Sequence, residues 1–92
     1  MITYKYIKSE DRSVALGETG KEIGECTVTV HPKYWSIDHT YVNPENRGQG
    51  IARGLLEAVV EAARKAGVKL QPICSYAVKA FQKIAEFQTI QY

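Results

Sequence analysis

The residues best suited to chemistry form a short glycine-containing turn, Arg47-Gly48-Gln49-Gly50-Ile51-Ala52-Arg53. A segment of alternating apolar and polar residues precedes the turn, and a segment with apolar residues at helical spacing follows it. A helix is therefore expected to begin at the turn. The first N–H groups of a helix have no partners inside it, and the helix dipole adds partial positive charge there. Gly48 and Gly50 carry no Cβ and let an anion approach, while Arg47 and Arg53 add full charges. The turn therefore predicts a site for phosphate or pyrophosphate.

The spacing of the glycines excludes two common phosphate-binding motifs. After Gly48 and Gly50 the next glycine is Gly54, one residue too late for the dinucleotide pattern G-x-G-x-x-G. The P-loop pattern G-x-x-x-x-G-K-[ST] is also absent. The spacing that remains is Arg47-x-x-Gly50-x-Ala52. The alternative is that the two glycines only make a tight turn from strand to helix.

The elements that must position this turn follow from the apolar pattern. Alternation predicts strands over residues 2–7, 13–16, 23–30 and 34–42. In the last of these, Trp35, Ile37, His39 and Tyr41 are expected on one face, and Ser36, Asp38, Thr40 and Val42 on the other. Helical spacing predicts a helix over 50–66 with Gly67 as its cap, a strand over 68–74 and a second helix over 76–87.

These elements predict an α+β fold: a mixed, mostly antiparallel sheet with two helices, in the order β-β-β-β-α-β-α. The strand–helix–strand unit is expected to be a right-handed crossover between parallel neighbours. Pro72 has no N–H to give, so the last strand is expected to have an edge or to leave its neighbour there.

Length and composition predict one domain, residues 1–92, in the cytoplasm. A net charge of +2 with scattered basic residues argues against nucleic acid, and no apolar run is long enough to cross a membrane. The N-terminus lacks the apolar core of a signal peptide. Cys26 and Cys74 fit neither C-x-x-C nor a zinc pattern, so no metal site is expected and both thiols are predicted to be reduced.

Three segments resemble the GNAT superfamily of acetyltransferases, in particular a branch of about this length. They are His39-Thr40 ahead of Val42, the Arg47-x-x-Gly50-x-Ala52 turn, and Pro72-x-Cys74-x-Tyr76. The resemblance covers roughly residues 20–87 and implies a minimal GNAT-like domain whose turn grips the pyrophosphate of acetyl-CoA. The residues that it implies for the cofactor are Tyr41, Val42, Arg47, Gly48, Gln49, Gly50, Ile51, Ala52, Arg53, Ala77 and Phe81.

The last helix departs from the superfamily pattern. An asparagine that usually bonds the pantetheine arm is replaced by Cys74, and a tyrosine that often protonates the leaving thiolate is replaced by Phe81. The usual general acid is therefore absent, and Tyr76 is a substitute to consider. The match places Cys74 beside the expected thioester, where a thiolate of lowered pKa could take the acetyl group; the alternative is a small thiol that only packs against the arm.

The predicted function is transfer of an acetyl group from acetyl-CoA to an amine, directly or through Cys74. His39 is the candidate general base because its ordinary pKa is near neutrality, although a structural histidine is an equal alternative; Asp38 and Glu25 are other candidates. The rival interpretation is a non-catalytic CoA-binding or interaction module. Elements with which larger relatives bind the acceptor are missing, so the amine, on a protein or a small molecule, is left open. The protein is expected to be a monomer or a weak homodimer.

Overall fold

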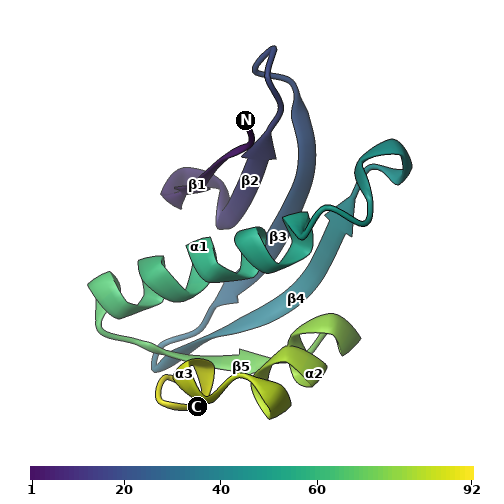
Figure 1. Ribbon diagram of the computed structural model, residues 1–92. Coiled ribbons are helices and arrows are strands. Elements are labelled where there is room, and N and C mark those ends of the chain that lie inside the picture. The colour runs from purple at the N-terminus through teal and green to yellow at the C-terminus, as the bar shows by residue number, and fades with distance from the viewer.

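A computed structural model describes residues 1–92 as a twisted five-stranded sheet with its α-helices on one side (Figure 1). The elements in chain order are β1 (Thr3–Ile7), η1 (Lys8–Glu10), β2 (Arg12–Leu16), β3 (Glu22–Val30), β4 (Tyr34–Val42), η2 (Pro44–Asn46), α1 (Ile51–Ala66), β5 (Lys69–Pro72), α2 (Ser75–Lys83) and α3 (Ala85–Gln88).

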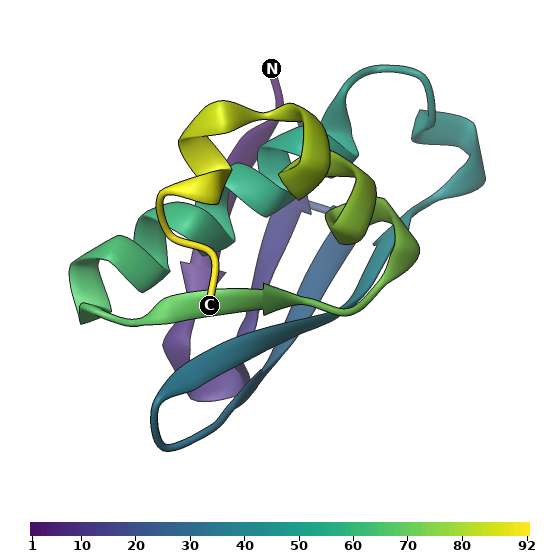
Figure 2. The same ribbon diagram turned by 90° about the horizontal axis from the view of Figure 1, so that it is seen from below.

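The sheet has the strand order β1-β2-β3-β4-β5, and the predicted fold class is confirmed. The first four strands are antiparallel, whereas β4 and β5 are parallel and are joined through α1. Figure 2, seen from below, shows α1, α2 and α3 above the strands. The opposite face of the sheet has no helix over it.

Helix α1 is the element that the sequence predicts best. It begins at Ile51, one residue later than expected, and ends at Ala66 with Gly67 as its left-handed cap. Its buried stripe packs on the sheet and supplies a large part of the core. The buried residues of the stripe are Ile51, Leu55, Leu56, Val59, Val60 and Ala63.

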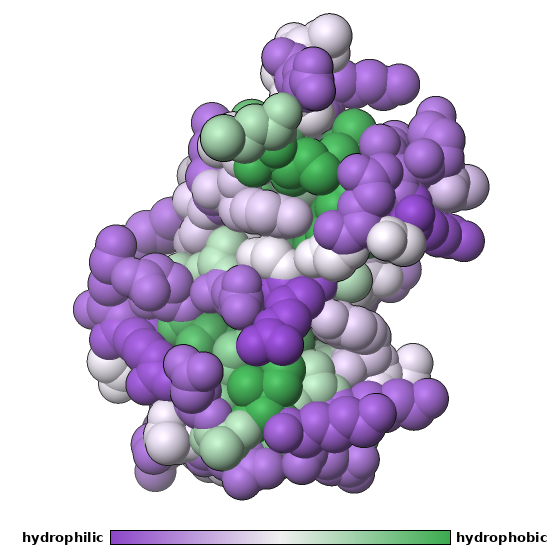
Figure 3. Space-filling model, viewed as in Figure 1, coloured by the Kyte–Doolittle hydropathy of each residue, from purple (hydrophilic) through white to green (hydrophobic).

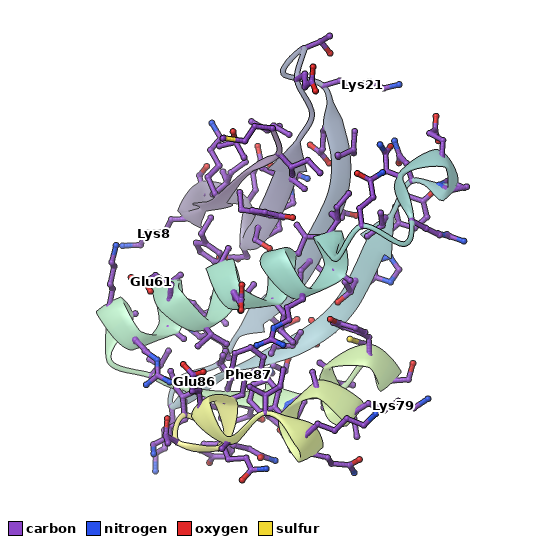
Figure 4. The ribbon with its side chains drawn as sticks, viewed as in Figure 1. Lys8, Lys21, Glu61, Lys79, Glu86 and Phe87 are labelled. Carbon is purple, nitrogen blue, oxygen red and sulfur yellow. The ribbon has the colours of Figure 1, made fainter.

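The second predicted helix is wrong in its length. Helix α2 ends at Lys83, Ile84 is extended (φ −103°, ψ 106°), and α3 follows as a separate short helix. The side-chain amide of Gln88 donates to the carbonyls of Phe81 and Gln82, which satisfies the end of α2. The break turns Phe87 back onto Phe81, with ring centroids 5.4 Å apart; Figure 4 places Phe87 between α1 and α3.

The predicted faces of β4 are wrong beyond Ile37 because the strand contains a bulge. Thr27 of β3 lies opposite His39, but the next residue, Val28, lies opposite Ile37, so Asp38 is an extra residue. The insertion reverses the alternation that follows it. Thr40 and Val42 therefore face the helices, while His39 and Tyr41 face outward.

The C-terminus covers the outer edge of β5. The N–H of Leu70 donates to Ile90, at 2.8 Å, and the N–H of Tyr92 donates to Leu70, at 2.7 Å. The ring of Tyr92 stacks on Tyr34, with centroids 4.1 Å apart. Strand β1 is therefore the open edge of the sheet.

No helix is long and apolar enough to span a bilayer. Hydrophilic residues dominate the face shown in Figure 3, and the apolar areas on it form separate patches above and below α1. Lysines such as Lys21 and Lys79 extend from the outer parts of the molecule in Figure 4.

Gly24 is required by close packing between β3, β4 and α1. A Cβ at this position would lie 2.9 Å from the carbonyl oxygen of Tyr41 and 3.1 Å from Leu55 Cδ1. We expect Gly24→Ala to lower the free energy of unfolding by about 1–3 kcal/mol in urea denaturation, because main chain must move. Gly17→Ala is the control: its Cβ would meet Ile23 at an ordinary 3.6 Å, and a change below about 0.5 kcal/mol is expected. Equal losses in both variants would contradict this packing role.

Candidate functional site

The candidate site lies where β4 and β5 part. Their pairing ends at Ile37 and Pro72, as Pro72 predicts, and the carbonyl of Ile37 accepts hydrogen bonds from the N–H groups of both Ile73 (3.0 Å) and Cys74 (3.1 Å). Beyond this point β4 continues to Val42 with no strand on that side. The separation opens a gap between β4 and the start of α2.

A cavity of about 290 Å³ occupies this gap. It brings together the end of β4, the turn before α1 and the first turn of α2. Three of the six exposed large apolar residues, Tyr41, Ile73 and Tyr76, belong to the same region. The cavity is lined by Thr40, Tyr41, Val42, Arg47, Ala52 and Tyr76.

The glycine turn, which lies between the lining residues Arg47 and Ala52, carries N–H groups without partners. Gly48 (φ 85°) and Gly50 (φ 76°) have left-handed backbone conformations, and a Cβ on either would meet no atom within 4 Å. Glycine is therefore favoured at both positions by the backbone conformation and not by a lack of space. The first N–H of the helix with an acceptor inside the chain is that of Gly54. The N–H groups of residues 48–53 have none. They form a cradle suited to an anion.

The two arginines of the turn differ in their partners. Nε of Arg47 donates to the carbonyl of Val42 at 3.0 Å, and its guanidinium lies over the ring of Tyr41, 5.8 Å from the centroid. Arg53 instead pairs with Glu57 on the next turn of α1, at 3.2 Å. Among the other predicted residues, Gln49 is exposed and Ala52 is half-buried, whereas the side chain of Ile51 is in the core and offers only its backbone.

Cys74 lies at the inner end of the gap as the N-cap of α2. The N–H of Ala77 donates to its sulfur at 3.4 Å, and Thr40 Oγ1 is 3.5 Å from the same atom. The first turn of α2 therefore directs a backbone donor at the sulfur. Two further predicted cofactor residues lie on α2 and are buried: Ala77, and Phe81, whose ring packs against Phe87.

The structure does not bring His39 to Cys74. The bulge turns His39 to the outer face of the sheet, where its exposed ring lies parallel to Tyr41 at 6.4 Å. The other candidate bases are engaged: Asp38 accepts from Ser36 and Thr29, and Glu25 accepts from Arg12. Thr40 occupies the inward position instead, and the strict alternation of the sequence gives no sign of it.

Tyr76 is the substitute that the sequence offers for the missing general acid. It lines the cavity, and burial is the largest cause that raises the pKa of its hydroxyl above the ordinary value, against a smaller lowering by Arg53. The hydroxyl is therefore protonated at neutral pH. Its position in the cavity is compatible with the role of general acid, which the tyrosine replaced by Phe81 has in the superfamily pattern.

Cys26 of β3 is buried behind Thr40, and burial raises the pKa of its thiol to about 11. The unfolded chain loses this proton near pH 9.0, whereas the native state keeps it to about pH 11, so stability falls as pH rises through this window. We expect wild type to lose about 2 kcal/mol more unfolding free energy across the window than Cys26→Ala. Urea denaturation at both ends of the window measures this difference. Equal alkaline losses would contradict the assignment.

The family model described as GCN5-related N-acetyl-transferase matches residues 12–90 of the chain. Among solved structures, a GCN5-like protein from Staphylococcus aureus is 30% identical. That match covers 100% of this chain and 87% of the other, with a TM-score of 0.72. No curated protein sequence matches the chain.

Two larger proteins share the fold over part of their length. The IAA acetyltransferase from Bacillus cereus is 29% identical over 78% of this chain and 51% of its own, with a TM-score of 0.62. N-acetylglutamate synthase from Neisseria gonorrhoeae, solved with coenzyme A and N-acetyl-glutamate, is 18% identical over 79% of this chain and 18% of its own, with a TM-score of 0.66. At that identity the likeness concerns the fold alone. The chain therefore belongs to the GCN5-related N-acetyltransferase family, whose members are acyltransferases.

Proposed function

We propose that the protein binds acetyl-CoA in the gap between β4 and β5 and transfers its acetyl group to an amine through Cys74. One observation carries the proposal: a single cavity is lined by Arg47 and Ala52, which flank the unpaired N–H groups of the glycine turn, and by Thr40 and Tyr76, which lie next to the capped thiol of Cys74 in space or in sequence. The residues fit the ligand, because the free N–H groups of residues 48–53 suit a pyrophosphate and the apolar lining suits a pantetheine arm.

The chain's own groups have separable roles in this proposal. The turn and Arg47 hold the pyrophosphate, and Tyr41, Val42 and Tyr76 line the arm. Acetyl-CoA supplies an activated acetyl group as a thioester. The Ala77 N–H and the start of α2 stabilise the Cys74 thiolate. Tyr76 is the proton donor for the departing thiolate.

The transfer balances in two steps. After Cys74 has lost its proton to solvent, its sulfur bonds to the carbonyl carbon as the bond from that carbon to the coenzyme's sulfur breaks. Tyr76 protonates the departing thiolate and regains a proton from solvent, so coenzyme A leaves as a thiol. The amine nitrogen then bonds to the same carbon as its bond to Cys74 breaks. The amine's proton returns to the Cys74 thiolate. A direct attack of the amine on the thioester needs no adduct on Cys74 and is the alternative route.

A second candidate function is CoA binding without transfer. The observation that favours it is the buried phenylalanine at position 81, where the superfamily pattern has a proton-donating tyrosine. In this alternative, Cys74 only packs against the pantetheine arm. His39, on the outer face, remains a proposed base only for an amine that approaches from that side.

Intact-mass spectrometry after incubation with acetyl-CoA, followed by addition of amines, tests the proposal. We expect one acetyl adduct that an amine removes, with matching release of coenzyme A; the panel includes a lysine peptide, a free peptide N-terminus and a polyamine. Binding with neither an adduct nor amine-dependent release of coenzyme A would favour the non-catalytic function. Amine-dependent release without an adduct would favour direct attack and overturn the role of Cys74.

The setting is inferred from two further features. Both cysteines are free, which agrees with a reducing compartment such as the cytoplasm. The open edge at β1 carries Lys5 and continues into Lys8, and edge lysines discourage strand pairing, so we propose a monomer or at most a weak homodimer.

A further inference from the structure

Three side chains from separate elements form a row beneath the gap: Cys26 of β3, Thr40 of β4 and Cys74 at the start of α2. Cys26 and Thr40 are direct cross-strand partners. Thr40 Oγ1 lies 3.5 Å from the sulfur of Cys26 and 3.5 Å from the sulfur of Cys74. The two thiols do not form a disulfide, so each can donate or accept a hydrogen bond.

The hydroxyl of Thr40 has one proton, and two sulfurs compete for it. When Thr40 donates to Cys26, as its geometry allows, its lone pairs face Cys74 and accept that residue's S–H. When Cys74 is a thiolate, the hydroxyl proton turns to Cys74 because a hydrogen bond to a charged acceptor is the stronger one. The Thr40 hydroxyl then no longer donates to Cys26.

Cys26 is suited to the far end of this row. It is fully buried, and burial raises the pKa of its thiol to about 11, so it stays a neutral thiol and only a weak acceptor for the Thr40 hydroxyl. The Thr40 hydroxyl therefore changes its acceptor from Cys26 to Cys74 when Cys74 loses its proton. In the thiolate state the Cys74 sulfur receives two donors, the Ala77 N–H and the Thr40 hydroxyl.

Charged groups from several elements act on the same cluster. The carboxylates of Asp38 and Glu25 raise the pKa of Cys26. On α1, Arg53 lowers the pKa of the neighbouring Tyr76 and Glu57 raises it. None of these charged groups hydrogen-bonds to either sulfur. The direct donors to Cys74 are therefore neutral and fixed by the fold.

We propose that Thr40 is a positioning residue whose hydroxyl donates to the Cys74 sulfur when Cys74 reacts as a thiolate, with Cys26 as the weaker acceptor that the same hydroxyl otherwise uses. The relevance of this row to acetyl transfer rests on the proposed function. The row itself acts on Cys74 whether or not a ligand is bound, so it can be tested without acetyl-CoA.

The test is the rate at which iodoacetamide alkylates Cys74 in the native protein, followed by peptide mass spectrometry that separates Cys74 from Cys26. The rate is compared at about pH 7 and about pH 10 in wild type and three variants. We expect Thr40→Val to slow alkylation about tenfold at neutral pH and to leave the alkaline rate unchanged, the change that loss of one hydrogen bond to a thiolate gives. Thr40→Ser, which keeps the hydroxyl, is expected to stay within about threefold of wild type, and Cys26→Ala, which removes the competing acceptor, is expected not to slow the neutral rate.

A wild-type rate in Thr40→Val at neutral pH would overturn the proposal. Equal slowing at both pH values would also overturn it, because it reports altered access to the thiol and not loss of thiolate. If thermal unfolding shows that Thr40→Val does not fold, Thr40→Ala decides: a neutral rate equal to wild type contradicts the role of the Thr40 hydroxyl. The proposed function fails separately, through absence of an acetyl adduct in a protein whose alkylation follows the expected pattern.

Discussion

Replacing Gly50 by valine is expected to weaken coenzyme A binding at least about thirtyfold. Gly50 is left-handed at φ 76° and is the N-cap of α1, so a β-branched residue there is strained by about 1–2 kcal/mol or moves the turn. The new side chain also stands in the open space over the N–H groups of residues 48–53, from which an anion must approach. Isothermal titration calorimetry with coenzyme A measures the loss.

Gly67 provides a matched control at the other end of the same helix. It is also left-handed, at φ 73°, and a Cβ there also meets no atom within 4 Å. Gly67→Val therefore carries a similar conformational cost but lies far along α1 from the turn. Both variants are expected to lose stability in thermal unfolding, and only Gly50→Val to lose affinity. Equal losses of affinity would mean that the turn has no specific role in binding.

Replacing Cys74 by alanine or serine is expected to abolish the acetyl adduct completely while coenzyme A affinity stays within about threefold of wild type. Alanine also removes the N-cap of α2, at a cost of about 1 kcal/mol, whereas serine keeps an acceptor for the Ala77 N–H. The serine variant therefore distinguishes loss of the nucleophilic sulfur from loss of the helix cap. Intact-mass spectrometry with acetyl-CoA and a parallel calorimetric titration are the measurements.

Cys26→Ala is the control for this pair, because Cys26 is fully buried beneath Thr40 and does not line the cavity, so this variant is expected to keep the adduct. An adduct that persists in Cys74→Ser would move the acetylated group elsewhere in the chain. Loss of coenzyme A affinity in Cys74→Ser would make Cys74 a binding residue and not a nucleophile.

The features that the sequence predicts well are those that neighbouring residues determine. Helix α1 has a complete apolar stripe and a glycine cap, so its ends are predicted to within one residue. The glycine turn is likewise local, since its left-handed positions require the residue type found at Gly48 and Gly50. Pro72 marks the end of the β4–β5 pairing because it lacks an N–H.

The features that the sequence does not predict depend on contacts between distant segments. The bulge at Asp38 arises from the pairing of β3 with β4, and no residue type near Asp38 indicates that the strand contains an extra residue there. This one residue exchanges the predicted positions of His39 and Thr40, and with them the expected neighbour of Cys74. The break at Ile84 similarly depends on contacts that Gln88 and Phe87 make with Phe81. Helical periodicity does not register these contacts and therefore predicts one continuous helix across the break.

The proposed location of the ligand is tested most directly by ¹H–¹⁵N correlation spectra of the labelled protein during titration with coenzyme A. We expect the largest shifts at the N–H groups of residues 48–53, which have no acceptor in the chain, and at residues 74–77 around the capped thiol. Absence of shifts at saturating coenzyme A would contradict the account. So would shifts centred instead on the other large cavity, between β1 and α1, which is lined by Tyr4, Tyr6 and Trp35 among others.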